Sequence, residues 1–198
     1  MIWLCRVLSM VGGFAVLEKV LRLTTGTSRL TDGEKNAAVA VFHETAITYE
    51  KIRIAEGGVL WLWYSFIEKN GRAFTLRRTI GMPTAGGHTR NDRLDILIHE
   101  LAHVLQFETV GTRYACEALD AQRQLGSRAY DYRNIDGLKT KRDAGERLKD
   151  LNREQQAQVA QDYHRWVLEP EQPLGDLEKQ RREDIYGPFI EELSQREV

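Results

Sequence analysis

Residues 94–111 read LDILIHELAHVLQFETVG, a run with the apolar periodicity of a helix, and HELAH stands at its centre. Residues four apart share one face of a helix, so His99 and His103 project side by side toward one point. Glu100 lies about 100° around the helix from His99, near the same edge. Two imidazoles at this spacing, beside a carboxylate that can deprotonate a bound water, are typical of a catalytic zinc site.

The rest of this stretch divides into a packed side and an open side. The helix is expected to open near Asp92 and to close before Gly111. The histidine side carries small and polar residues, namely Asp95, Ala102 and Gln106. The opposite side carries an apolar stripe that would anchor the helix in a core: Leu94, Leu97, Ile98, Leu101, Val104 and Leu105. A chance match to the motif has odds of about one in a hundred here, so a core helix that merely carries two histidines is the weaker interpretation.

Composition limits the number of domains and the classes of partner. The 198 residues, 42% of them hydrophobic, suffice for one buried core and are few for two. Lys and Arg number 28 against 29 Asp and Glu, so no net basic field attracts nucleic acid and no polybasic run marks an anionic membrane surface. We expect no nucleic-acid partner. Cys5 and Cys116 allow at most one disulfide and belong to no zinc-knuckle or redox motif.

The chain divides into three expected segments. Residues 1–23 contain an uncharged run, Val7 to Leu17, that is shorter than the ~20 apolar residues of a spanning helix. The segment therefore predicts a docked helix or a signal or anchor. Membrane association is expected only through this segment, if at all. Residues 24–168 contain the motif and form the predicted catalytic domain. Residues 169–198 are charged and predict a loosely attached helical extension.

The central segment predicts an α+β fold. Residues 59–67 and 73–82 have strand character, and Asn70-Gly71 between them is a hairpin signal. Beyond the motif the chain is mostly helical. Two helix starts have the spacing of a capping box, in which a side chain and the third helical residue bond to each other's backbone: Thr31 with Glu34, and Asn152 with Gln155.

A catalytic zinc ion usually takes three protein ligands and leaves its fourth position to water, so a third ligand must lie elsewhere in the chain. The downstream candidates are Glu117 in CEALD, Glu154 at the start of REQQAQVAQDY, and His164 on the same helix as Glu154. Spacing alone does not choose among them. Asp162 falls two turns after Glu154 on nearly the same face, where it could orient a ligand histidine through the distal N–H of its ring.

LIHELAHVLQ resembles the zincin metallopeptidases of the gluzincin type, in which a glutamate on a following helix completes a His-His-Glu site. More narrowly, the chain resembles a bacterial family of zinc peptidases: the core domain associated with extracellular contractile injection systems, and the Vgr-related proteins linked with type VI secretion. The segments that carry this resemblance are VFHETAITYEKIRIAEGG, AFTLRRTIGMP, LIHELAHVLQF, SRAYDY and REQQAQVAQDY, within residues 30–167. The HExxH part is highly specific and the rest moderately so.

The resemblance implies a zincin-like fold, with a small β-sheet on a mainly helical body and the HExxH helix at the active-site cleft. It also implies that Glu154, in the EQQA segment, joins His99 and His103 as the third ligand of a Zn²⁺ ion. The chain departs from the family in its tryptophan-rich VLWLWYSF, its N-terminal segment and its charged tail. These departures leave the substrate, the targeting and the compartment open, whether bacterial cytoplasm or delivery through a secretion system.

Motif and resemblance together predict a zinc-dependent peptidase linked to bacterial secretion or toxin delivery. Glu100 is the expected general base, and Tyr132 is the expected donor to the oxyanion, with Tyr130 and His164 as alternatives. The expected partners are a peptide or protein substrate and components of a secretion system. The alternative is a catalytically silent zinc-binding interaction module of a contractile injection or type VI secretion system. Glu100 favours the enzyme, because a structural zinc site needs no base beside its ligands.

Overall fold

The computed structural model describes residue 5 and residues 12–56, 73–82 and 91–198. The helices are α2 (Gly13–Thr24), α3 (Asp32–Phe42), α5 (Leu94–Val110), α6 (Arg113–Leu125), α7 (Asn134–Asp143), α8 (Arg153–Tyr163) and α9 (Asp176–Ser194). The strands are β1 (Thr27–Ser28), β2 (Arg53–Glu56), β3 (Phe74–Leu76) and β4 (Thr79–Met82). Helix α8 continues into a π-helical turn over His164–Leu168.

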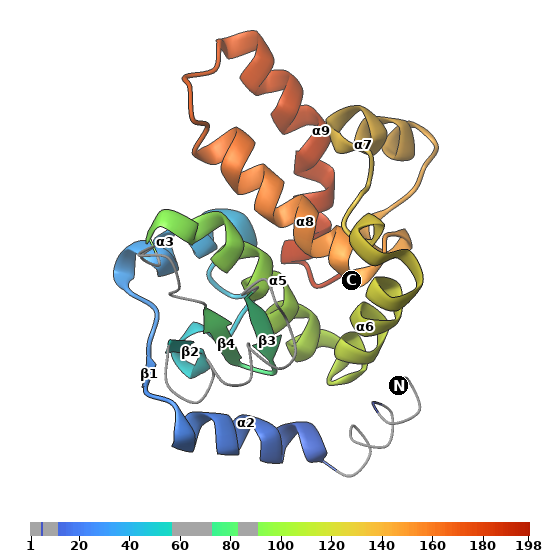
Figure 1. Cartoon of the computed structure of the whole chain (residues 1–198). Coiled ribbons are helices and arrows are strands. Elements are labelled where there is room, and N and C mark those ends of the chain that lie inside the picture. Colours follow the sequence, from blue (N-terminus) through green and yellow to red (C-terminus); the bar gives the residue numbers. More distant parts are fainter. Residues whose placement is uncertain (1–4, 6–11, 57–72, 83–90) are drawn as a thin grey trace.

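The four strands form one mixed sheet in the order β1-β2-β4-β3. Strands β2 and β4 run parallel in the middle, and β1 and β3 pair antiparallel at the two edges. The sheet lies between α5 on one side and α2 on the other (Figure 1). A small sheet on a mainly helical body confirms the predicted α+β class.

A hairpin forms within residues 73–82, which were predicted to be one strand. Residues 59–67 and the Asn70-Gly71 turn lie outside the described residues. The single strand predicted over residues 73–82 is two strands, β3 and β4, joined through Arg77, whose φ is 58°. No Gly or Asn marks this turn, so the sequence offered no local signal for it. It is held instead by tertiary contacts: the backbone N–H of Arg78 donates to Glu18, and its side chain pairs with Glu108.

Helix α5 is anchored in the core as its apolar stripe predicts. Its residues Leu97, Ile98, Leu101, Val104 and Leu105 are fully buried, while Leu94 is partly buried. The helix begins after Arg93 and ends at Gly111, whose φ of 67° suits glycine. Both predicted ends are therefore confirmed within a residue or two.

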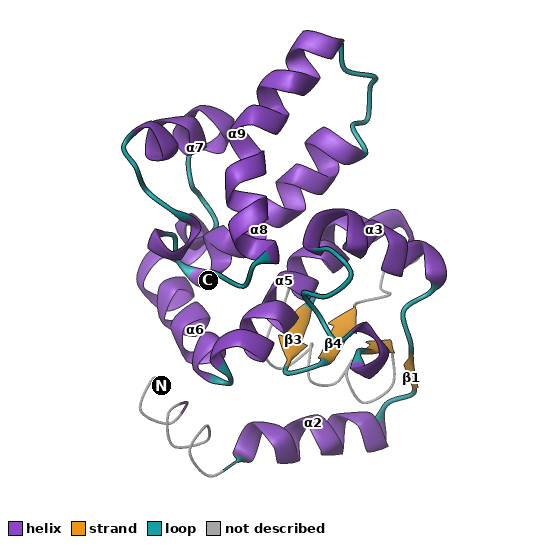
Figure 2. Cartoon of the chain, turned by 180° about the vertical axis from the view of Figure 1, so that it is seen from behind, coloured by secondary structure: helices purple, strands orange, loops and turns teal. Residues whose placement is uncertain are grey.

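The C-terminal tail forms helix α9, but the expectation that it is loosely attached is wrong. Its apolar residues share one face of the helix and are buried in the same core as α5: Ile185, Tyr186, Phe189, Ile190 and Leu193. Figure 2 shows α9 lying against α7 and α8. The charged residues on its other face dominate the composition, and they obscured this apolar stripe in the sequence.

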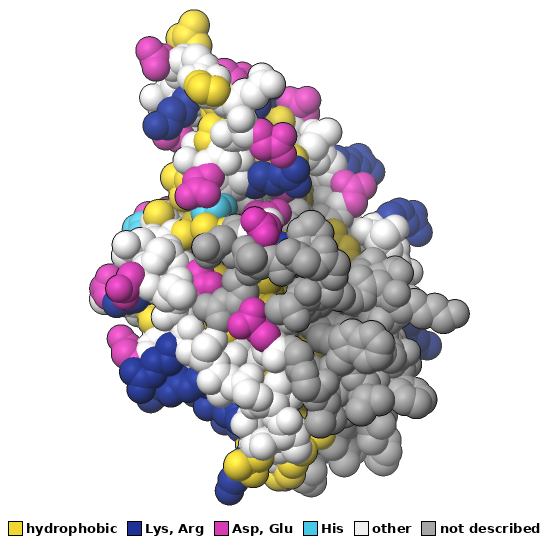
Figure 3. Space-filling view, turned by 60° about the vertical axis from the view of Figure 1, so that its left-hand side comes forward, with side chains coloured by type: hydrophobic (Ala, Val, Ile, Leu, Met, Phe, Trp, Pro, Cys, Tyr) yellow, Lys and Arg dark blue, Asp and Glu magenta, His cyan; other side chains and the backbone are white. Residues whose placement is uncertain are grey.

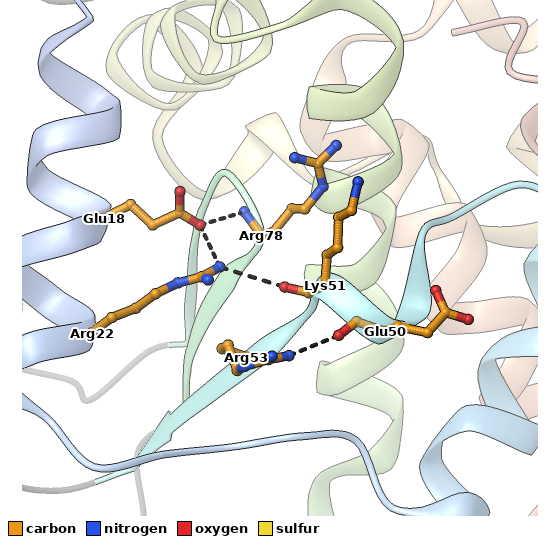
Figure 4. A pocket seen from close by; sticks show the side chains of 6 residues that line it. All are labelled: Glu18, Arg22, Glu50, Lys51, Arg53 and Arg78. Carbon is orange, nitrogen blue, oxygen red and sulfur yellow. Dashed lines mark hydrogen bonds and ion pairs between the residues drawn. The ribbon is translucent and has the colours of Figure 1, made fainter.

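Polar side chains of helix α2 bond to the sheet. Arg22 Nε donates to Thr79 Oγ1 at 2.7 Å. Glu18 Oε1 accepts from the Arg78 N–H at 3.1 Å (Figure 4). Upstream of α2, Cys5 forms a disulfide with Cys116 on α6. Within the described part of the chain, no helix has the length and hydropathy needed to cross a bilayer.

Candidate metal centre

The centre is built where α5 and α8 pack against each other in antiparallel directions. At one end of the contact, Gln161 Nε2 donates to Asp95 Oδ2 at 2.9 Å. At the other end, Gln106 Nε2 donates to the carbonyl of Arg153 at 3.0 Å. This register places the first turn of α8, which carries Glu154, opposite the two histidines of HELAH.

The start of α8 holds Glu154 in place. The Asn152 side chain accepts from the backbone N–H groups of Glu154 and Gln155. The Gln155 side chain in turn accepts from the backbone N–H of Asn152. This is the capping box that the sequence predicts. A carboxylate in the first turn is also favoured by the positive end of the helix dipole. Local capping therefore stabilises the anion at the position where it faces α5.

His99, His103 and Glu154 converge on one point. Their ligand atoms all lie within 4.8 Å of one another. Glu154 Oε2 lies 3.4 Å from His99 Nε2 and 3.5 Å from His103 Nε2. Ligand atoms bonded at about 2.0–2.1 Å to a tetrahedral ion stand about 3.3 Å apart, so these separations suit a metal ion between them. The three residues can hold a metal ion, as predicted for this set.

Burial and mutual charge shape the protonation of the group. Burial opposes protonation of His103, but the adjacent Glu154 carboxylate outweighs it and raises the pKa of His103 to about 9. Burial likewise opposes ionisation of Glu154, yet His103 and His99 hold the pKa of this carboxyl well below its ordinary value. Without metal, a proton on His103 therefore balances the Glu154 carboxylate.

Gln106 fixes the orientation of the His103 ring. His103 Nδ1 lies 2.8 Å from Gln106 Oε1. The Gln106 amide nitrogen donates to the Arg153 carbonyl and to Gln156 Oε1, which leaves its oxygen for the histidine. Nδ1 must then carry the proton and donate it, so Nε2 keeps its lone pair for a metal. The sequence indicated only that Gln106 shares the histidine side.

Glu154 is supported from α6. Gln122 Nε2 donates to Glu154 Oε1 at 3.0 Å and lies 2.9 Å from the hydroxyl of Tyr130. One oxygen of the carboxylate is thus held by protein, and the other faces the two imidazoles. No spacing in the sequence pointed to Gln122, because it is brought here only by the packing of α6 on α8.

Glu100 lies on the side of α5 that faces the sheet. Thr75 on β3 donates its hydroxyl to Glu100 Oε2 at 2.7 Å, and Tyr114 donates to the Thr75 carbonyl at 2.8 Å. Burial raises the pKa of Glu100, and the nearby His103 and His99 partly offset this rise. The carboxyl is therefore a stronger base than an exposed glutamate.

The other candidates for a third ligand lie apart from the group. Both oxygens of Glu117 are engaged, one by Arg113 and one by Arg153, which explains why it does not reach the histidines. His164 is 3% exposed, and its Nε2 lies 4.0 Å from Glu169 Oε2. Of the three predicted candidates, only Glu154 lies beside the histidine pair.

Of the residues predicted to support the metal group, Tyr130 contacts it, whereas Tyr132 and Asp162 bond to each other. Tyr132 is buried and donates its hydroxyl to Asp162, with Tyr186 Oη 2.9 Å away, so its proton is directed away from the metal group. The other oxygen of Asp162 accepts from Gln158, so Asp162 does not orient His99 as predicted. His99 Nδ1 has no hydrogen-bond partner among the described residues. Tyr130 contacts the group instead, its ring centroid 5.8 Å from that of His99.

The group is closed from solvent in this structure. His99, His103 and Glu154 are 6%, 7% and 2% exposed. Neither the cavity beside α2 nor the cavity at the start of α5 is lined by these three residues. A search of protein-family models, curated proteins and solved structures found no match to this chain. What the protein does is therefore inferred from the geometry of this group.

Proposed function

We propose that this protein is a zinc-dependent peptidase with a zincin-like fold, in which His99, His103 and Glu154 hold Zn²⁺ and Glu100 is the general base. The observation that carries the proposal is the convergence of two Nε2 atoms and one carboxylate oxygen within 4.8 Å, with a buried carboxylate next to the first histidine. Two imidazoles and one carboxylate are a ligand set that zinc favours, and they leave one position open for chemistry.

Each residue has a distinct task in peptide hydrolysis. A bound Zn²⁺ would supply Lewis acidity and lower the pKa of water toward neutrality. Glu100 takes the proton of the attacking water and passes it to the leaving amine, a task for which a raised pKa is suited. Thr75 holds Glu100 Oε2, which leaves Oε1 to carry the proton. Tyr130 is the proposed donor to the oxyanion, because its ring lies beside that of His99. The expected donor Tyr132 instead gives its hydroxyl proton to Asp162, and His164 lies apart from the metal group.

The link to bacterial secretion or toxin delivery rests on the family resemblance alone. One observation favours the alternative, a catalytically silent zinc-binding module of such a system: the low exposure of the three ligands. A substrate must reach the metal, whereas a partner of an interaction module need not. The buried base beside His99 favours the enzyme, because it has no task in a purely structural site.

The test is a zinc determination and a hydrolysis screen on the same preparation. The purified protein is expected to contain about one zinc per chain and to cleave members of a peptide library analysed by mass spectrometry. Removal of zinc by a chelator should abolish cleavage, and restoring zinc should recover it. A protein that holds zinc and cleaves nothing supports the interaction module, and one that takes up no zinc removes both proposals.

Zinc affinity should fall as the pH is lowered. Zn²⁺ must displace the proton of His103, whose pKa is about 9, while Glu154 stays ionised throughout because its pKa is held low. Below pH 9 we expect about a tenfold loss of affinity per pH unit, with one proton released per zinc. Competition with a chromophoric chelator at pH 6.5, 7.5 and 8.5 would measure the slope. An affinity that does not change over this range would contradict the coupling.

Replacement of Gln106 by methionine should lower zinc affinity by about 10- to 100-fold, the usual effect of losing a contact behind a ligand histidine. The change removes the acceptor that fixes the His103 tautomer. Gln124→Met, on the exposed side of α6, is the matched control and should leave affinity unchanged. Ring ¹⁵N shifts of His103 give a readout that stability alone would not move, measured on the metal-free protein above pH 9, where the ring is neutral. The proton should sit on Nδ1 in the wild type and be shared between both nitrogens in the variant.

A further inference from the structure

Helix α2 presents apolar side chains to solvent and bonds to the sheet through polar ones. Its polar residues Glu18 and Arg22 face the sheet and bond to β4 and the turn before it. Its apolar residues Val16, Val20 and Leu23 point outward and are 63%, 51% and 76% exposed. Their spacing of four and three places them on one face of the helix. Such an apolar face on the surface of a protein marks a site of contact with another apolar phase or partner.

A basic cavity lies beside this helix. Its volume is about 220 Å³, and it is lined by Glu18, Arg22, Glu50, Lys51, Arg53 and Arg78 (Figure 4). Arg22 pairs with Glu18, and Arg78 pairs with Glu108. Two of the cations are left without a carboxylate among the described residues. Among the described residues, the Arg53 side chain donates to the backbone carbonyls of Glu50 and Ile52, and the Lys51 ammonium group has no acceptor.

Four cations and two carboxylates, Glu18 and Glu50, line the cavity, so the positive charge is in excess. Burial and the neighbouring cations Arg29 and Arg22 lower the pKa of Arg53, as expected for a cation without an anionic partner. Lys19 is exposed on α2 itself. Figure 3 shows Lys and Arg side chains gathered on the lower part of one face, with hydrophobic side chains below them at the edge formed by α2 in Figure 1. Apolar and basic groups therefore share one side of the molecule.

We propose that this surface docks on a lipid membrane that contains anionic phospholipids. Val16, Val20 and Leu23 enter the boundary between headgroups and acyl chains, and Lys51 and Arg53 bind lipid phosphates. A helix with one apolar face and basic neighbours lies in the interface plane rather than across the bilayer. Anionic headgroups above an apolar phase complement both parts of this surface at once.

The charge distribution argues against a second copy of this chain as the occupant. A two-fold interface built on α2 would place the same patch of each subunit opposite itself. Lys19, Lys51 and Arg53 of one subunit would then meet the like charges of the other, which disfavours association. The inference does not depend on the proposed peptidase activity, since none of these residues belongs to the metal centre.

The test is sedimentation of the full chain with vesicles of phosphatidylcholine alone or with a share of phosphatidylglycerol. Binding should be at least about tenfold stronger to the anionic vesicles and should weaken with added salt. The double variant Lys51→Gln/Arg53→Gln should lose about fivefold for each charge on anionic vesicles only. Val20→Asp/Leu23→Asp should abolish binding to both vesicle types. Lys51, Val20 and Leu23 are exposed and Arg53 is partly exposed, and none of them belongs to the metal centre. Circular dichroism and zinc content should therefore match the wild type.

Matched controls lie in another part of the molecule. Lys149→Gln and Leu177→Asp change an exposed lysine and a leucine that is 90% exposed, and both should bind vesicles as the wild type does. The proposal is overturned if the wild type sediments with neither vesicle, or if the charge variant binds anionic vesicles as tightly as the wild type. It is also overturned if the protein is a dimer in solution that Val20→Asp/Leu23→Asp converts to a monomer, because α2 then serves self-association.

Discussion

Glu100→Gln is expected to lower kcat for peptide hydrolysis by about 10²- to 10⁴-fold, the usual contribution of a general base, while the zinc content stays at the wild-type level. The amide keeps the shape of the side chain and can still accept the Thr75 hydroxyl. It cannot take a proton from water. Because Glu100 is not a ligand, the metal group formed by His99, His103 and Glu154 should remain intact.

The assay would compare initial rates on one peptide substrate with zinc measured on the same samples. Glu117→Gln is the matched control: it makes the same change on α6, at a carboxylate that pairs with Arg113 and Arg153 instead of the metal group. It should retain wild-type kcat. Equal rates in Glu100→Gln and the wild type would show that another group is the base, and the mechanism proposed for Glu100 would be abandoned.

Loss of Glu154 should have the largest effect on metal binding among the three residues considered as third ligand. Glu154→Gln and Glu154→Ala are expected to weaken zinc binding by more than about 100-fold, the upper end of what losing an outer contact costs. Glu117→Ala and His164→Ala should keep about one zinc per chain. The reason is geometric: only Glu154 brings an oxygen to 3.4 and 3.5 Å from the two Nε2 atoms.

Elemental analysis after dialysis against a weak chelator would rank the variants. His103→Ala serves as the positive control for metal loss. Glu154→Gln guards against a folding artefact, because the amide fills the same space and a melting temperature near that of the wild type would show that the core is intact. Zinc retained in Glu154→Gln and lost in Glu117→Ala would contradict the ligand set. A wild type that takes up no zinc would make HELAH a segment of an ordinary core helix.

The sequence by itself determined the features that depend on near neighbours. The spacing of His99 and His103, the bounds of α5 and the capping boxes at Thr31 and Asn152 involve groups no more than a few residues apart. Helical geometry converts such spacing directly into position. The α+β class followed from the same local patterns. Glu154 as the third ligand came from the family resemblance, since spacing left Glu117 and His164 equally open.

Tertiary structure decided whatever joins distant segments. The contacts of Gln161 with Asp95 and of Gln106 with Arg153 set the register of α8 on α5, and no local pattern encodes that register. The burial of α9 was hidden because composition averages its apolar and charged faces. The basic surface beside α2 is likewise formed only by the tertiary structure. No polybasic run exists in the chain, yet folding brings Lys19, Lys51 and Arg53 to one side, because charge at a surface depends on proximity in space rather than along the sequence.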